Sequence, residues 1–228
     1  MQLPKTPSFR LDGRRALVTG AGRGIGLAAA AALADAGAQV TLVARSRAEI
    51  EEAAAAIRAA GGAAEPLVLD VLDIPAVERA IAAAEPFDML VNNAGTNRPK
   101  PFVDVTHDDY DAVMDLNLRS AFFVAQAVVK RLVAAGKPGS IINISSQMGH
   151  VGGANRTIYC ASKWGMEGMT KAMAVDLAAH RIRVNTVCPT FIETPLTRPF
   201  FEDAAFKASV LSKIKLGRIG QVEDLMGA

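Results

Sequence analysis

Short apolar runs alternate along the chain with longer segments of helical composition. Several of these runs are continuous, such as ALV, TLVA and MLV, which is typical of strands covered on both faces. A strand with one exposed face would instead alternate apolar and polar residues. The pattern therefore predicts a parallel sheet. Its candidate strands lie at residues 16–19, 39–43, 64–69, 89–92, 140–144 and 183–187.

The segments between these runs are rich in Ala, Leu, Glu and Arg, which favour helix. Those at 25–36, 47–60 and 74–84 each end near glycine or proline. Repeated strand–helix–strand units predict right-handed connections. We expect a single α/β domain over residues 1–228, doubly wound and Rossmann-like, with a parallel sheet and helices on both faces.

Composition and charge narrow the classes of function. Half of the 228 residues are hydrophobic, and the net charge of +2 is not gathered into runs of one sign. Neither a nucleic-acid partner nor an anionic membrane surface is therefore expected. The N-terminus contains no apolar signal segment, and no stretch approaches about 18 uncharged apolar residues. These features predict a soluble, cytoplasmic protein.

The cysteines and histidines, which are the usual zinc ligands, are few and widely spaced. The two cysteines, Cys160 and Cys188, match neither a disulfide framework nor a zinc motif and are expected to be packing residues. The three histidines, His107, His150 and His180, lie far apart in the sequence. No metal site is expected from this spacing.

A glycine-rich turn directly follows the first predicted strand. It begins at Thr19, reads TGAGRGIG and runs into the first predicted helix. Such a turn points free backbone N–H groups and the positive end of a helix at one place, and glycines let phosphates approach the backbone. The residues expected to hold a pyrophosphate are Gly20, Arg23, Gly24, Ile25 and Gly26.

The end of the second predicted strand indicates which dinucleotide is bound. NAD-binding proteins commonly carry an acidic residue there for the adenosine ribose. This chain has Arg45 and no carboxylate at that position, and a guanidinium can pair with a 2′-phosphate. Arg23 is a second candidate for the same phosphate. NADP(H) is therefore favoured over NAD(H).

Further motifs follow in order along nearly the whole chain. They are Asp70-Val71, Asn93-Ala94-Gly95, Asn117, Ser146, the YxxxK pair Tyr159 and Lys163, and Pro189, Ile192 and Thr194. Together with the glycine turn, this ordered set resembles the short-chain dehydrogenase/reductase family. The resemblance implies a Rossmann-like oxidoreductase in which Asp70, Val71, Asn93, Ala94, Gly95, Tyr159, Lys163, Pro189, Ile192 and Thr194 contact the cofactor.

The same resemblance implies catalytic roles for four residues. Tyr159 would exchange a proton with the substrate oxygen, and Ser146 would hydrogen-bond that oxygen. Four-residue spacing places Lys163 and Tyr159 on one helix face. There the ammonium, together with the positive nicotinamide ring of the oxidised cofactor, is expected to lower the pKa of the phenol. Lys163 would also hold the nicotinamide ribose, and the Asn117 region would position a water that links Lys163 to solvent.

Loops at 96–98, 147–157 and 191–206 are expected to border the substrate, with about 191–215 forming a lid. Candidate substrate contacts are Ser146, Gln147, His150 and Phe191. The mixture of polar and aromatic residues favours a small polar ketone or secondary alcohol, such as a sugar, polyol or keto acid.

Two alternatives remain open. The first is a 3-oxoacyl thioester reductase, although the residues before Tyr159 depart from the run often seen in that group. The second is a non-catalytic NADP-binding module, against which the complete set of Ser146, Tyr159 and Lys163 argues.

The resemblance also implies a homodimer or homotetramer, with the helix over about 107–135 and the Met166 helix between subunits. Family members continue past residue 228 into a further strand. We therefore expect this chain to lack that strand, with the strand at 183–187 left at the edge of the sheet.

Overall fold

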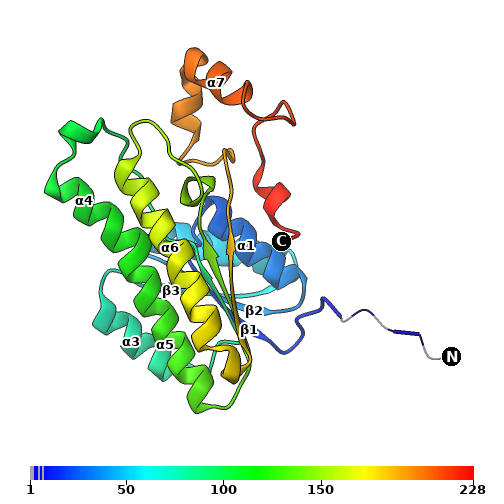
Figure 1. Cartoon of the computed structure of the whole chain (residues 1–228). Helices are drawn as coiled ribbons and strands as arrows, with labels where there is room; N and C mark the ends of the chain where they lie inside the picture. The colour runs from blue at the N-terminus through cyan, green and yellow to red at the C-terminus, as the bar shows by residue number, and fades with distance from the viewer. Residues whose placement is uncertain (1–2, 5, 7) are drawn as a thin grey trace.

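A single parallel sheet organises the computed structural model, which describes residues 3–4, 6 and 8–228 (Figure 1). In the described part of the chain the strand order is β3-β2-β1-β4-β5-β6, and every neighbouring pair is parallel. The strands are β1 (Arg15–Thr19), β2 (Gln39–Ala44), β3 (Ala63–Val68), β4 (Met89–Asn92), β5 (Gly139–Ile144) and β6 (Ile182–Val187). This order confirms the doubly wound α/β fold.

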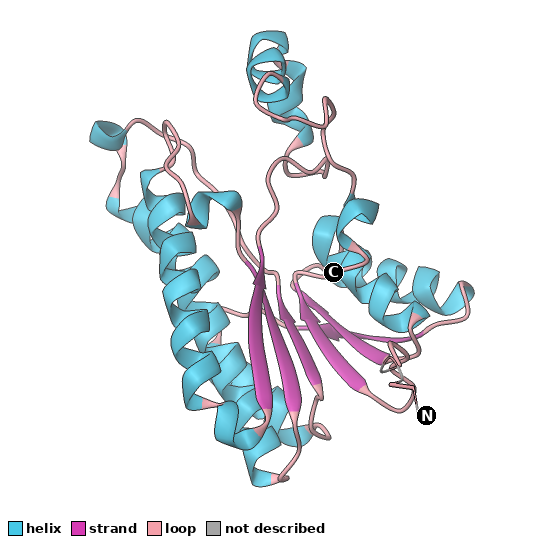
Figure 2. Cartoon of the chain, turned by 45° about the vertical axis from the view of Figure 1, so that its right-hand side comes forward, coloured by secondary structure: helices cyan, strands magenta, loops and turns pink. Residues whose placement is uncertain are grey.

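Helices cover both faces of the sheet (Figure 2). They are α1 (Gly24–Asp35), α2 (Arg47–Ala59), α3 (Ile74–Ala83), α4 (His107–Met114), α5 (Ser120–Ala134), α6 (Thr157–Asp176) and α7 (Ala204–Leu211). One core cluster joins the sheet to α1 and α2, and the other joins it to α3, α5 and the end of α6. The central strands therefore have apolar neighbours on both sides, as their continuous apolar sequences predict.

Strand β3 differs from the central strands because it lies at one edge of the sheet. It covers residues 63–68, one residue earlier than expected, and most of its side chains are exposed or half-buried. Pro66 lies in the middle of it, a residue that cannot donate to a neighbouring strand and is tolerated at an edge. Strand β6 lies at the other edge.

The long helix expected over about 107–135 contains an irregular turn. Between α4 and α5, Asp115–Arg119 forms a π-helical segment with Asn117 buried inside it. By length and composition alone the helix over His107–Ala134 could cross a membrane, although 44% of its most apolar window is buried in this fold. A helix that covers a sheet has the same composition, and Val124, Val128 and Leu132 of α5 lie in the core.

The segment after β6 rises above the carboxyl ends of the strands (Figures 1 and 2). It contains the short helix Arg198–Glu202 and α7. Asp203 begins α7 by accepting hydrogen bonds from the backbone N–H groups of Ala205 and Phe206. The expected lid is thus an ordered helical cap that stands over the edge where the predicted site residues lie.

Candidate active site

The glycine turn after β1 lies against the end of β4. These are the two neighbouring strands at which the strand order of the sheet changes direction. Gly20 and Gly24 have φ of +62° and +59°, a region that favours glycine. At Gly26, a Cβ atom would lie 2.3 Å from the oxygen of Gly20. A side chain at that position would therefore push the turn and α1 apart. The turn leaves room for a phosphate to approach the backbone, and in this respect the residues fit a dinucleotide.

Asn93 and Thr19 fasten this turn to β4. The Asn93 side-chain amide donates to the oxygens of Thr19 and Gly20 at 3.0 and 3.1 Å. In return, the Thr19 hydroxyl accepts from the backbone N–H groups of Asn93 and Ala94 at 3.0 and 3.1 Å. The Asn93 amide is thus committed to holding the turn, so the residue shapes the site through the backbone.

A groove of about 590 Å³ runs from this turn across the ends of β2 and β3. Ser46, Glu49, Leu69 and Leu116 are among its lining residues, and none of them was expected from the sequence. Leu196 also lines it and lies in the 191–206 loop, which was expected to border the substrate. The expected cofactor residues that line it are Gly20, Arg23, Gly24, Ile25, Arg45, Asp70, Val71, Asn93, Ala94, Gly95 and Thr194.

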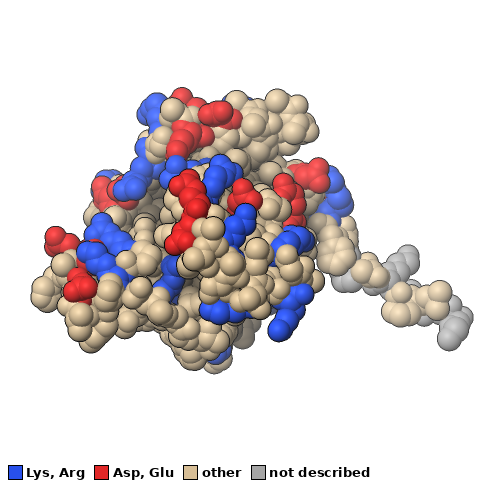
Figure 3. Space-filling model, turned by 90° about the horizontal axis from the view of Figure 1, so that it is seen from above, with Lys and Arg blue, Asp and Glu red and all other residues tan. Residues whose placement is uncertain are grey.

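Both arginines expected to bind a 2′-phosphate lie beside carboxylates. Arg23 Nη1 is 3.1 Å from Glu49 Oε1, and Arg45 Nη1 is 3.9 Å from Asp70 Oδ2. Basic and acidic side chains are interspersed over this whole face (Figure 3). The sequence places no carboxylate at the end of β2, but the first turn of α2 brings Glu49 back to the glycine turn. A phosphate here would compete with Glu49 for Arg23.

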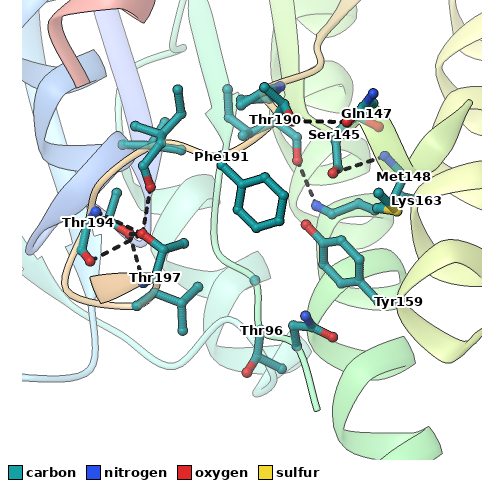
Figure 4. Close-up of a pocket in the computed structure, with 18 of the residues that line it drawn as sticks. Thr96, Ser145, Gln147, Met148, Tyr159, Lys163, Thr190, Phe191, Thr194 and Thr197 are labelled. Carbon is teal, nitrogen blue, oxygen red and sulfur yellow. Dashed lines mark hydrogen bonds between the residues drawn. The ribbon is translucent and has the colours of Figure 1, made fainter. Parts of the chain in front are cut away.

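A second hollow, a cavity of about 190 Å³, adjoins the groove at the ends of β4 and β5. The two share Ile25, Asn93, Gly95, Thr194 and Leu196, so they form one continuous site. Of the expected residues, Ser146, Gln147, Tyr159, Lys163, Pro189, Phe191 and Ile192 also line the cavity. Phe191 lies between the Thr194 to Thr197 turn and the pair Tyr159 and Lys163 (Figure 4).

Lys163 is buried one helical turn after Tyr159. Its Nζ donates a hydrogen bond of 2.7 Å to the backbone oxygen of Ile144 and lies 5.7 Å from the centre of the Tyr159 ring. Burial lowers the pKa of Lys163 to about 8, although Cys188 and Glu167 act in the opposite direction. The ammonium is therefore the main form at neutral pH, and it is held at the floor of the cavity.

In the chain alone, the pKa of Tyr159 shifts in the opposite direction to the shift that the sequence predicts. Burial raises the pKa of Tyr159, while the Ser146 hydroxyl and then the Arg156 guanidinium lower it. The expectation that Lys163 lowers this pKa is therefore not met by the chain's own groups, because desolvation of the phenolate outweighs the favourable interactions. The phenol is protonated at neutral pH, which is the form that donates a proton to a carbonyl oxygen.

Asn117 lies outside both hollows, and its side chain is fully buried. Its Oδ1 accepts from the N–H of Thr96, and its Nδ2 donates to the Thr96 oxygen and to Ser162 Oγ at 2.9 and 3.1 Å. These bonds tie the loop after β4 to α6 next to Lys163. Asn117 is therefore a positioning residue in this structure. It lies in the π-helical segment between α4 and α5, and such segments are common near functional sites.

The substrate-side residues are placed partly as expected. Gln147 lines the cavity and accepts a hydrogen bond of 2.9 Å from Thr190. His150 is placed differently, because it does not line the cavity and its ring instead faces Cys188 and Glu167. Arg156 and Phe200 were expected only as parts of loops, and both line the cavity, with the guanidinium 5.7 Å from the ring centre.

Removal of the Tyr159 hydroxyl should test the assigned proton donor. In Tyr159→Phe, kcat should fall by about 10² to 10⁴-fold because no acid remains beside the substrate oxygen. Binding of the cofactor, followed by fluorescence titration, should stay near the wild-type value. Tyr110→Phe is the matched control, since Tyr110 is exposed on α4. Wild-type turnover in Tyr159→Phe would exclude the assignment.

The burial of Lys163 predicts a pH dependence of stability. Its folded pKa of about 8 lies below its ordinary value of 10.5, so the unfolded chain binds more protons between these values. The free energy of unfolding should therefore rise with pH across this window. Compared with Lys163→Met, the wild type should gain about 2 to 3 kcal/mol between about pH 7 and about pH 10, measured by urea denaturation.

Lys171→Met provides the control for this measurement, because Lys171 is exposed on the same helix. Its stability difference from the wild type should not change with pH. A difference for Lys163→Met that stays constant over the same range would contradict a depressed pKa.

Known proteins resemble this chain over nearly its full length. The sequence profile of the family described as short chain dehydrogenase matches residues 14–205. L-xylulose reductase from Bos taurus is 42% identical over 218 residues, which cover 96% of this chain and 88% of that protein. D-erythrulose reductase from Gallus gallus is 40% identical over 222 residues, which cover 97% of this chain and 89% of that protein.

Solved structures agree with these matches. A gluconate 5-dehydrogenase from Burkholderia cenocepacia, in complex with NADP and tartrate, has 41% sequence identity and a TM-score of 0.91. That alignment covers 96% of this chain and 87% of the other. A short-chain type dehydrogenase/reductase from Mycobacterium marinum has 38% identity, a TM-score of 0.90 and the same two coverages.

Proposed function

The chain belongs to the short-chain dehydrogenase family, and we propose that it is an NADP(H)-dependent enzyme that interconverts a small sugar-acid ketone and its secondary alcohol. Its membership makes it an oxidoreductase acting on CH–OH and C=O groups, which rules out the non-catalytic alternative. The related reductases of L-xylulose and D-erythrulose favour a small polar substrate over a 3-oxoacyl thioester. The proposal of NADP(H) as the cofactor rests on Arg23 and Arg45, which line the groove. The proposal of a substrate with a carboxylate rests on Arg156, which lines the cavity.

The reaction needs a hydride, a proton and a polarised carbonyl. Bound NADPH supplies the hydride. The chain supplies the rest: Ser146 donates a hydrogen bond to the substrate oxygen, and the protonated Tyr159 gives that oxygen its proton. Lys163, held by the Ile144 oxygen, stabilises the phenolate that forms and can return the proton. The glycine turn and the groove hold the cofactor beside the cavity.

Arg156 is the observation that favours a sugar acid. Its guanidinium is half-buried and lines the cavity next to Tyr159. Among the described residues it makes no ion pair, and its central carbon lies 5.7 Å from the centre of the Phe200 ring. A partly desolvated guanidinium is costly without an anion, and its fork of donors fits a carboxylate. The tartrate in the Burkholderia cenocepacia enzyme is such a carboxylate.

Substitution of Arg156 should separate sugar acids from neutral sugars. With NADPH as cofactor, Arg156→Met should lower kcat/KM for 5-keto-gluconate by about 10 to 10²-fold, because a charged hydrogen bond is lost. The value for L-xylulose should change little. Arg98→Met is the control, since Arg98 already pairs with Asp109 outside the cavity. Equal losses for both substrates would refute the role of Arg156 as a carboxylate anchor.

Arg23 and Arg45, each beside a carboxylate in the groove, should determine whether the enzyme prefers NADP(H) or NAD(H). Loss of the guanidinium in Arg45→Gln should weaken NADPH binding by about tenfold or more and leave NADH binding unchanged. Glu49→Gln should act in the opposite direction, because it frees Arg23 for the 2′-phosphate. Arg47→Gln is the control, as Arg47 pairs with Glu51 outside the groove. A wild type that prefers NADH would overturn this proposal.

We also propose that the enzyme is a homodimer or homotetramer. The outer face of the α4 to α6 layer supports this, because Tyr110, Phe122 and Trp164 are exposed on it at 49%, 44% and 53%. Large apolar side chains gathered on one face are typical of an interface. A cytoplasmic location remains a prediction.

A further inference from the structure

Three side chains of metal-binding type converge behind the wall of the cavity. They are His150, in the loop after β5, Glu167 in α6 and Cys188, which directly follows β6. Their ligand atoms all lie within 4.8 Å of one another. None of the three lines the cavity or the groove, so the cluster is separate from the site described above.

The distances within this cluster match those of a tetrahedral metal site. Cys188 Sγ lies 3.3 Å from His150 Nε2 and 3.3 Å from Glu167 Oε1, and Nε2 lies 3.7 Å from Oε1. Zinc bonds of about 2.3 Å to sulfur and about 2.0 to 2.2 Å to nitrogen and oxygen place tetrahedral ligands about 3.4 to 3.6 Å apart. One ion could therefore reach all three atoms with shifts of a few tenths of an ångström.

A nucleophilic thiol would need another arrangement. In a catalytic relay, the carboxylate holds one ring nitrogen of histidine while the nucleophile faces the other. Here the carboxylate and the thiol both approach the same nitrogen, His150 Nε2. Convergence of all three atoms on one point is the geometry of ligation.

The surroundings of Glu167 support the same interpretation. Its side chain is 7% exposed, and its ion-pair partner among the described residues is His150, at 3.7 Å. The second carboxylate oxygen, Oε2, accepts a hydrogen bond of 3.2 Å from Thr186. A ligating carboxylate is commonly held by a hydrogen bond to its other oxygen. Thr186 thus orients Glu167 toward the cluster.

We propose that His150, Glu167 and Cys188 bind one Zn²⁺ ion. Thiolate, imidazole and carboxylate together suit zinc better than magnesium or calcium, which prefer oxygen ligands alone. Binding displaces the thiol proton, which passes to solvent. The half-exposed ring of His150 leaves an open side through which the ion enters and where water completes the coordination.

The chain offers matched controls for a direct binding test. Cys160 is its other thiol, and His107 and His180 are its other histidines. Isothermal titration with Zn²⁺ should give one site per chain in the wild type and in Cys160→Ser and His107→Ala. Affinity should fall at least tenfold in Cys188→Ala and His150→Ala, and about tenfold in Thr186→Val, which removes only the orienting hydrogen bond.

Two further measurements keep the test independent of whether the variants fold well. Co²⁺ added to Cys160→Ser should produce a thiolate-to-cobalt charge-transfer band, and Zn²⁺ should protect the remaining thiol of that variant from alkylation. Circular dichroism of Cys188→Ala and His150→Ala confirms that each is folded before titration. The proposal is overturned if the wild type binds no Zn²⁺ at micromolar concentrations. It is equally overturned if binding persists in Cys188→Ala, or if Co²⁺ binds to Cys160→Ser without the thiolate band and without protection of Cys188.

Discussion

The hydrogen bonds between Asn93 and the glycine turn are the contacts on which the site depends. They join the ends of β1 and β4, the neighbouring strands at which the sheet's order reverses. Without them the turn could drift from β4, and Gly26 could no longer pack against the Gly20 oxygen. The groove and the cavity share residues on both sides of this junction. Because these two strand ends are held together, the distance between cofactor and substrate is fixed. Hydride transfer depends on this, since it tolerates little misplacement.

Burial is the second constraint, and it shifts the pKa values of Tyr159 and Lys163 in opposite directions. It raises the pKa of the phenol and lowers that of the ammonium, so both neutral forms are favoured. The Ile144 carbonyl holds the Lys163 ammonium by a hydrogen bond, and Cys188 and Glu167 oppose the lowering of its pKa. The Ser146 hydroxyl and the Arg156 guanidinium oppose the rise in the pKa of Tyr159. The chain is thus prepared to donate a proton. The reverse reaction requires additional positive charge near the phenolate, which an oxidised nicotinamide would supply when bound.

Features encoded by neighbouring residues could be predicted from the sequence. Continuous apolar runs gave the buried strands, and the glycine turn directly after β1 gave the phosphate site. Contacts between distant segments could not be predicted in this way. Glu49 reaches Arg23 only because α2 folds back over the turn, and His150 meets Cys188 only because β5 and β6 are adjacent. The direction of the pKa shift of Tyr159 in the chain alone could not be predicted either, since the degree of burial has no local signature in the sequence.

The loop from Ser146 to Tyr159 connects the two sites. Gln147 and Arg156, at its two ends, line the cavity, whereas His150 between them turns to the opposite side and meets Cys188 and Glu167. The same loop therefore places one cation toward the substrate and one ligand toward the proposed metal. Cys188 is followed directly by Pro189, which lines the cavity, and Glu167 lies one turn after Lys163 on α6. An ion held by the three ligands would join this loop, α6 and the end of β6. It would thereby restrain the segments that carry Ser146, Lys163 and Arg156 without contacting the substrate.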